Sequence, residues 1–191
     1  MEFTPPLKRR DFIKTGLLSF AGVMMLPSCL KDYSPFLFLT AEEASLLSAI
    51  SDRRIPEDTN GPGATQAGVI YYIDKQLYEV FKDDQQTYRN GLKAIDSSCQ
   101  QLHAAHFEDL DIDSRDLFLE KMEQNNLPGE YWKKNSASGF FSMIIKHSMQ
   151  GFYGPPRHGG NKNYISYKIM DLDYPYVVGQ NRYREKPIYE D

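Results

Sequence analysis

The side chains of this chain that could do chemistry do not converge in the sequence, and two histidines are the first pair to consider. His103 and His106 stand three residues apart in a predicted helix, a spacing that lets two imidazoles reach one metal ion. No third ligand lies nearby in the sequence, and neither His-Glu-x-x-His nor Cys-x-x-Cys occurs. We therefore expect a structural pair and no metal site.

Paired carboxylates are the next candidates, because a glycosidase needs two of them in one cleft. They occur at Glu42-Glu43, at Asp83-Asp84 and at Asp109 with Asp111. Each pair lies beside a predicted helix start, where negative charge favours the helix dipole. The glycine-rich stretch 154–161 lacks the Lys-Ser ending of a phosphate loop. We expect no catalytic residue and no bound cofactor in this chain.

The two cysteines, Cys29 and Cys99, have different predicted roles. Cys99 falls in a stripe whose residues are spaced by alternating steps of four and three, which places them on one face of a helix. The stripe comprises Tyr88, Leu92, Ile95, Cys99, Leu102 and His106. A thiol in such apolar surroundings has a raised pKa and is inert. We therefore expect Cys99 to be a buried core residue.

The first 28 residues resemble a twin-arginine export signal, which is read by a receptor that exports folded proteins. Arg9 and Arg10 are followed by Phe12 and Lys14, and then by a moderately apolar run. The uncharged run 15–28 is shorter than the about 20 apolar residues that a membrane-spanning helix needs. We therefore predict a signal peptide and export to the periplasm by the twin-arginine route.

The end of this run, Leu26-Pro27-Ser28-Cys29, resembles a bacterial lipobox. In that pattern the cysteine is acylated and becomes the new N-terminus, so we predict a lipoprotein anchored to the membrane through Cys29. Residues 29–38 are then a tether, and residues 39–191 are long enough for a single domain. A charged content of 25% and a net charge of −4 show no basic excess, so nucleic-acid binding is not expected.

The domain is predicted to be all-α, with about five helices. Thr40 and Glu43 form a capping-box pattern at the start of the first helix, which ends before Pro56. The later helices are marked by apolar stripes within residues 69–81, 88–106, 117–122 and 140–148. We expect Asp113 to cap the fourth helix and Gly151 to close the fifth.

The chain changes character after Gly151, where glycine, proline and tyrosine become frequent and no periodicity is clear. A tail of about 40 residues without periodicity is uncommon inside a compact domain. We expect it to pack over a surface, either of this chain or of a partner.

One pattern in this tail is specific. It consists of Gly151-Phe152-Tyr153, Pro156, Gly159-Gly160-Asn161, Tyr167 and Lys168. Further matching positions precede it: Asp52, Ile55-Pro56, Pro62-Gly63-Ala64, Ala67-Gly68-Val69, Ile73-Asp74, Tyr88, Gly91-Leu92, Phe107 and Phe140-Phe141. Together, over about residues 40–172, they resemble the gluconate 2-dehydrogenase subunit 3 family. The chain departs from the family's usual aspartate, tyrosine and tryptophan at Pro155, His158 and Tyr167.

The resemblance implies an accessory subunit without an active site of its own. In such complexes a large flavoprotein of the glucose-methanol-choline type binds FAD and oxidises a sugar, and a cytochrome c subunit can carry electrons to the membrane. The small subunit is thought to assist maturation of the large one and to lend it a twin-arginine signal. Locally, Gly159 and Gly160 would supply positive φ and Asn161 would tie the loop by hydrogen bonds.

We expect the partner-binding surface to form from residues 52–64 and 151–167, where glycines and prolines fix an irregular backbone. Interface centres favour tyrosine and arginine. The expected contact residues are Tyr153, Arg157, His158, Tyr164 and Tyr167, with Arg53 or Arg54 adding a charged contact. Two alternatives remain: a sugar-binding envelope lipoprotein whose tail tyrosines stack on the ligand, and a stand-alone periplasmic enzyme. Convergence of polar groups from separate motifs would favour either one.

Overall fold

The computed structural model describes residues 34–59 and 61–172, and over these residues it is helical and contains no strand. The all-α prediction is confirmed. The long helices of this part are α2 (Ala41–Arg54), α4 (Val69–Glu79), α5 (Gln85–His103), α6 (Ile112–Glu123) and α7 (Ala137–Tyr153). The short elements are α3 (Ala64–Ala67), α8 (Ile165–Ile169) and the 3-10 turns η1 (Lys82–Asp84), η2 (Phe107–Asp109), η3 (Pro156–His158) and η4 (Lys162–Tyr164).

The predicted export residues Arg9, Arg10, Phe12 and Lys14, and the predicted lipidation site Cys29, lie outside the described residues. Among the helices that the structure does describe, none combines the length and the hydropathy needed to cross a bilayer.

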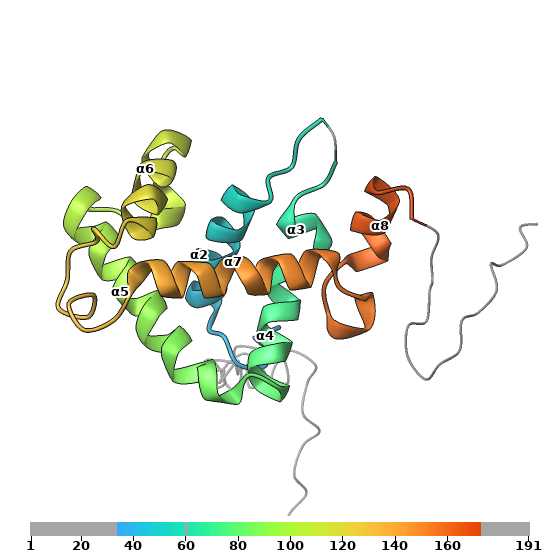
Figure 1. Ribbon diagram of the computed structural model, residues 1–191, viewed down its shortest axis with the longest axis horizontal. Helices are drawn as coiled ribbons and strands as arrows, with labels where there is room; N and C mark the ends of the chain where they lie inside the picture. Colours follow the sequence, from blue (N-terminus) through green and yellow to red (C-terminus); the bar gives the residue numbers. More distant parts are fainter. Residues whose placement is uncertain (1–33, 60, 173–191) are drawn as a thin grey trace, which may run out of the picture. The chain divides into compact units, whose positions relative to one another are not determined.

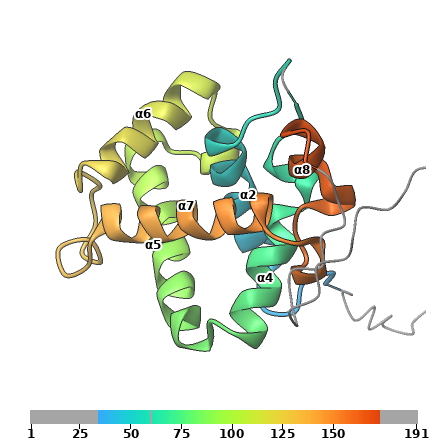
Figure 2. The same cartoon turned by 45° about the vertical axis from the view of Figure 1, so that its right-hand side comes forward.

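Helix α7 is the centre of the domain. It contacts α2, α3, α4, α5, α6 and α8, and it runs across the middle of the molecule in both ribbon views (Figure 1, Figure 2). Helices α5 and α6 lie toward one end of α7, whereas α3 and α8 lie toward the other (Figure 1). The two ends of the domain therefore present different elements to solvent.

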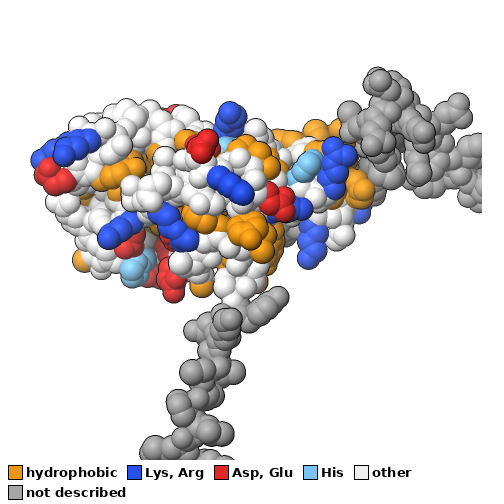
Figure 3. Space-filling view, turned by 90° about the horizontal axis from the view of Figure 1, so that it is seen from below, with side chains coloured by type: hydrophobic (Ala, Val, Ile, Leu, Met, Phe, Trp, Pro, Cys, Tyr) orange, Lys and Arg blue, Asp and Glu red, His pale blue; other side chains and the backbone are white. Residues whose placement is uncertain are grey.

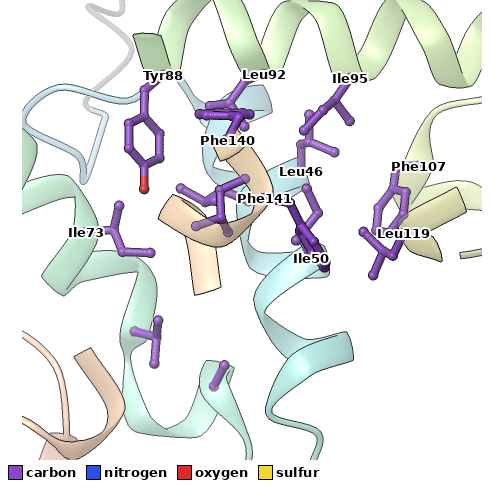
Figure 4. Packing of buried hydrophobic residues seen from close by; sticks show 14 of the residues in the cluster. Leu46, Ile50, Ile73, Tyr88, Leu92, Ile95, Phe107, Leu119, Phe140 and Phe141 are labelled. Atoms are coloured by element: carbon purple, nitrogen blue, oxygen red, sulfur yellow. The ribbon is translucent and has the colours of Figure 1, made fainter. Parts of the chain in front are cut away.

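The core forms where α2, α4 and α5 meet α7. Phe140 and Phe141 of α7 lie between the side chains of α5 and those of α2 (Figure 4). Tyr88 of α5 packs edge-on against Phe140, with ring centroids 5.4 Å apart. Cys99 lies on the same α5 face and is fully buried, as predicted, and burial raises its pKa to about 11. A thiol with such a pKa is protonated at neutral pH and inert.

Helix starts agree with the sequence at α2 and differ at α6. Thr40 and Glu43 form the predicted capping box, since each side chain accepts a hydrogen bond from the other's backbone amide. At α6 the cap is Asp111 and not Asp113: an Asp111 carboxylate oxygen accepts from the amide of Ser114 at 2.9 Å. Asp113 instead lies in the first turn, where its charge still favours the dipole.

The third predicted helix is shorter than its stripe. Helix α5 ends at His103 because Ala104 adopts a left-handed conformation, with φ of 54°. His106 therefore lies beyond the helix and is exposed, and Leu102 is 38% exposed. The prediction that these two residues belong to the apolar face was wrong, whereas Tyr88, Leu92, Ile95 and Cys99 are buried as expected.

Two further predictions at helix ends were wrong. Val80, placed in the second apolar stripe, follows the last residue of α4 and is 62% exposed. Gly151 does not close α7, which continues to Tyr153. Gly151 lies against the Tyr72 ring, where an added Cβ would come within 3.0 Å, so the glycine allows close packing of α7 on α4.

Residues 36–39 are part of the packed structure, although residues up to 38 were expected to be tether. Phe36 and Phe38 pack against the core, and Leu39 is buried. The packed part of the chain therefore begins before Leu39.

Candidate partner-binding surface

The loop between α2 and α3 is held in shape by polar side chains at both of its ends. The Asp52 carboxylate accepts from the backbone amide of Thr65 at 2.8 Å and from its hydroxyl at 2.6 Å. Gly63 donates to the Gln66 side chain at 3.0 Å, and a Cβ on Gly63 would lie 2.7 Å from the carbonyl oxygen of Ile55. Glycine is therefore required where the loop closes on itself.

The segment that follows α7 folds around Asn161. This side chain is fully buried, donates to the carbonyl of Gly154 and accepts from the amide of Ser166, both at 2.9 Å. Gly159 has φ of 106°, as predicted for this turn. The reason predicted for Gly160 was wrong: its φ is not positive, and glycine is needed because a Cβ would lie 2.1 Å from the carbonyl oxygen of Gly151.

These two segments, far apart in the sequence, meet at one end of the domain. Helix α3 contacts η4, and a Cβ on Gly61 would lie 2.8 Å from Cδ1 of Ile169 in α8. Both ribbon views place α3 and α8 side by side (Figure 1, Figure 2). We call the surface formed by residues 55–59, 61–63 and 153–172 the loop face. Asn60 is not described.

Five of the predicted contact residues belong to the loop face. Tyr153 is 47% exposed and packs edge-on against Phe152, with ring centroids 4.9 Å apart. Arg157 is exposed, and its Nε donates to Nε2 of His158 at 3.1 Å. Tyr164 and Tyr167 are half-buried, with ring centroids 6.0 Å apart. The face thus presents aromatic and cationic side chains on an ordered backbone.

The two predicted arginines lie at the end of α2 and contact other elements. Arg53 forms a bidentate pair with Asp116 of α6, at 2.8 and 2.5 Å. This hydrogen-bonded pair lowers the pKa of Asp116 and raises that of Arg53. Arg54 is exposed, with its guanidinium 5.5 Å from the centroid of the Phe141 ring. Arg53 therefore ties α2 to α6, and Arg54 is the more accessible of the two.

The histidine pair is not brought together on one helix, contrary to the prediction. His103 ends α5 with its ring 6.4 Å from that of Phe118, whereas His106 lies beyond the helix. Nδ1 of His106 lies 2.7 Å from a carboxylate oxygen of Asp96, and this hydrogen bond raises the pKa of His106. Within residues 34–59 and 61–172, no group of three or more His, Cys, Asp or Glu side chains could hold a metal ion.

Two cavities of similar size lie away from the loop face. One, of about 270 Å³, is lined by Asn90, Lys93, Ala94, Ser97, Ser98, Gly129, Glu130, Tyr131 and Trp132. The other, of about 250 Å³, is lined by Glu42, Glu43, Leu46, Leu92, Lys93, Asp96, His106 and Glu108. Of the tail tyrosines that the structure describes, Tyr153, Tyr164 and Tyr167, none lines either cavity, so neither cavity supports the idea that these three stack on a sugar there.

Sequence reasoning assigned no structural role to Asp74, the most connected polar residue on α4. Asp74 is 3% exposed, and its carboxylate accepts from the backbone amides of Leu37, Phe38 and Leu39 at 2.7 to 2.9 Å. The available signal was a carboxylate between the apolar residues Ile73 and Leu77 of a predicted helix. Its partners lie more than 30 residues earlier, so no local pattern could identify them.

Comparison with known proteins gives one match. A family model described as gluconate 2-dehydrogenase subunit 3 matches residues 41–173, which includes both segments of the loop face. No curated protein and no solved structure matches the chain.

Proposed function

The chain belongs to the gluconate 2-dehydrogenase subunit 3 family, and from that premise we propose that it is the non-catalytic small subunit of a flavin-dependent sugar or polyol dehydrogenase complex. The large subunit, a flavoprotein of the glucose-methanol-choline type, binds FAD and oxidises the substrate. A cytochrome c subunit is a further candidate member. The small subunit assists maturation and export of the large one.

Export of folded proteins explains why one signal can serve two chains. FAD must be loaded before the flavoprotein leaves the cytoplasm, and the twin-arginine route accepts folded cargo. The signal residues Arg9, Arg10, Phe12 and Lys14 would therefore direct an assembled complex to the periplasm. Acylation of Cys29 would then hold the complex at the membrane.

The observation that carries this proposal is the structural role of the residues that make up the family signature. Gly63, Gly159, Gly160 and Asn161 shape two loops that meet at one end of the domain. Each of these residues shapes the loop to which it belongs, through a close backbone approach or through hydrogen bonds to the backbone. Because the characteristic residues of the family shape a surface in this chain, a role as a binding subunit fits better than a role as an enzyme.

The loop face has the composition of a protein interface. Tyrosine and arginine are enriched at interface centres, and a few such residues usually carry most of the binding free energy. Tyr153 and Arg157 are the exposed members of this kind, and they lie four residues apart in the chain. We assign the docking of the flavoprotein to them, with His158, Tyr164 and Tyr167 beside them.

Capture of the flavoprotein by purified variants tests this assignment. Tyr153→Ala and Arg157→Ala should each weaken capture with little change in melting temperature, because both side chains are exposed. Tyr78→Ala is the matched control, since Tyr78 is 51% exposed but belongs to α4 and not to the loop face. Undiminished capture by both loop-face variants, or a lower melting temperature with capture retained, would contradict the assignment.

A further inference from the structure

The segment that leads into α2 is fixed to the side of α4 by a buried carboxylate. Asp74 accepts three consecutive backbone amides, those of Leu37, Phe38 and Leu39. A single carboxylate that binds three successive amides fixes both the position and the direction of the chain that carries them. The segment therefore cannot move away from α4 without leaving a buried charge unpaired.

Helix α5 holds the same segment from its other side. The guanidinium of Arg89 lies 4.2 Å from the centroid of the Phe38 ring, donates to the Phe38 carbonyl at 2.5 Å and pairs with Glu43. Since Glu43 also completes the capping box of α2, the hold on Phe38 is tied to the start of that helix. Residues 36–39 are thus fixed to α2, α4 and α5 together.

This arrangement creates an apolar patch around the point where the chain enters the domain. Phe36 stacks on Tyr71, with ring centroids 5.7 Å apart. Leu37, Tyr71 and Tyr78 are 56%, 49% and 51% exposed, and Tyr71 and Tyr78 lie two turns apart on the side of α4 that bears Asp74. We call Phe36, Leu37, Tyr71, Lys75 and Tyr78 the α4 face. Seen from this side of the domain, hydrophobic side chains gather into a patch (Figure 3).

From this geometry we infer that the α4 face rests on the surface of a lipid bilayer. Cys29 is the first residue of the predicted tether, and only seven residues, 30–36, separate it from Leu37. The eight Cα steps from Cys29 to Leu37 span at most about 28 Å when the chain is fully extended. If Cys29 is acylated, the face that carries Leu37 is held within that distance of the membrane. The inference rests on the proposed lipidation of Cys29.

The chemistry of the α4 face suits a bilayer surface. Tyrosine side chains favour the level of the lipid headgroups, because the ring is apolar and the hydroxyl is polar. Leu37 supplies an aliphatic side chain that can reach the acyl boundary, and buried apolar area adds to the attachment given by the lipid anchor. Lys75 supplies a cation beside the two tyrosines, which anionic headgroups attract.

The α4 face also adjoins the loop face, so membrane contact would orient the docked partner. Nζ of Lys75 donates to the carbonyl of Arg157 at 3.3 Å, and a Cβ on Gly159 would lie 3.1 Å from the carbonyl oxygen of Tyr71. A flavoprotein bound to the loop face would therefore lie beside the bilayer.

Fluorescence quenching by brominated lipid tests the inference on the mature chain, residues 29–191. Coupling a maleimide lipid to Cys29 supplies the anchor chemically, and the buried Cys99, with its raised pKa, is protected from the reagent. The vesicles contain phosphatidylcholine brominated near the headgroup together with phosphatidylglycerol. Tyr78→Trp places a reporter on the α4 face, and Leu117→Trp is its control on α6, where Leu117 is 49% exposed. Trp132, the one natural tryptophan, gives the baseline.

If the α4 face contacts lipid, the emission of the tryptophan introduced by Tyr78→Trp should shift to shorter wavelength. Brominated vesicles should quench most of the emission that this tryptophan adds to the Trp132 baseline. Leu117→Trp should keep its added emission, because α6 and α4 lie on different sides of the domain in both ribbon views (Figure 1, Figure 2). Equal quenching of the two variants, or none of either, overturns the inference. The inference is also overturned if lipid does not quench the tryptophan of Tyr78→Trp but added flavoprotein covers it, since the partner would then occupy this face.

The chemical anchor separates this result from the proposed lipidation. Mass spectrometry of the mature N-terminus from cells tests whether Cys29 is acylated, whereas the quenching experiment proceeds whatever that answer is. An unmodified Cys29 would refute natural anchoring alone, and unquenched Tyr78→Trp on anchored protein would refute the lipid-facing α4 face alone.

Discussion

Tyr88 and His147 form a buried hydrogen-bonded pair in the middle of the core. The Tyr88 hydroxyl lies 2.8 Å from Nδ1 of His147, and Phe81 stacks on the imidazole with ring centroids 4.6 Å apart. Burial lowers the pKa of His147, chiefly because the charged form is poorly solvated there, and burial raises the pKa of Tyr88. Both groups are therefore neutral in the folded protein near pH 7.

This pair predicts a loss of stability on mild acidification. As pH falls through about 6.5, the ordinary histidine pKa, His147 gains a proton in the unfolded chain before it does so in the folded one. The free energy of unfolding should therefore decrease below pH 6.5, and His147→Gln should reduce this decrease in denaturant titrations between pH 7 and 5. His106 acts in the opposite direction, because its raised pKa favours the folded state at low pH. An unchanged pH dependence in His147→Gln would contradict this account.

Asp74 is the second residue whose removal has a specific expected result. Asp74→Ala leaves the amides of Leu37, Phe38 and Leu39 without their acceptor, which should cost about 1–3 kcal/mol of unfolding free energy. Hydrogen exchange should accelerate at these three amides more than elsewhere. Asp74→Asn is the matched control, since it keeps one acceptor oxygen and should lose less. Unaltered exchange at residues 37–39 in Asp74→Ala would show that Asp74 does not hold the segment.

At the scale of elements, the close contact of Gly160 with Gly151 joins the loop face to α7. Gly160→Ala would place a Cβ 2.1 Å from the Gly151 carbonyl oxygen, so backbone must move, and we expect a loss of about 1–3 kcal/mol. Gly139→Ala is the control, because its Cβ would meet only the Ser136 side chain, at 3.2 Å. Denaturant unfolding compares the two. Equal stability of Gly160→Ala and the wild type would contradict the close packing seen here.

Which elements could be predicted depends on whether their causes are local in sequence. The capping box at Thr40 and the buried position of Cys99 follow from spacing within a few residues, and both are found. The end of α5 does not follow from local spacing, because Ala104 is a good helix former by residue type and yet adopts a left-handed conformation. Asp111 and Asp113 are equally good caps by residue type, so sequence could not choose between them.

The candidate site was predictable in part for the same reason. Glycine and proline predict an irregular backbone at residues 52–64 and 151–167, but residues 52–54 end α2, residues 151–153 end α7 and residues 165–167 begin α8, so the irregular parts are shorter. The contacts of α3 with η4 and of Gly61 with Ile169 place the two segments at one end of the domain, and their role in binding a partner stays a prediction. The pairing of Arg53 with Asp116 was missed, because it joins residues 63 positions apart. The hydrogen bonds from the amides of residues 37–39 to Asp74 were missed for the same reason, because these residues also lie far apart in the sequence. Contacts of this range depend on how helices pack around α7.

At the scale of the whole molecule, the chain presents two adjoining surfaces with different proposed partners. We propose that the loop face binds the flavoprotein and that the α4 face rests on the bilayer. Lys75 and Arg157 contact each other where the two faces meet. A small subunit built in this way would fix both the position of its partner and the side that the partner turns toward the membrane.

The central claim is that this chain carries its flavoprotein partner out of the cytoplasm, and the most direct test is to locate that partner when the signal is disabled. Arg9→Lys together with Arg10→Lys alters only the predicted export signal, which lies outside the described residues, so we expect the fold to be unchanged. After cell fractionation, we predict that both chains, with FAD bound to the large one, remain in the cytoplasm. Delivery of the flavoprotein to the envelope at the wild-type level would contradict the claim.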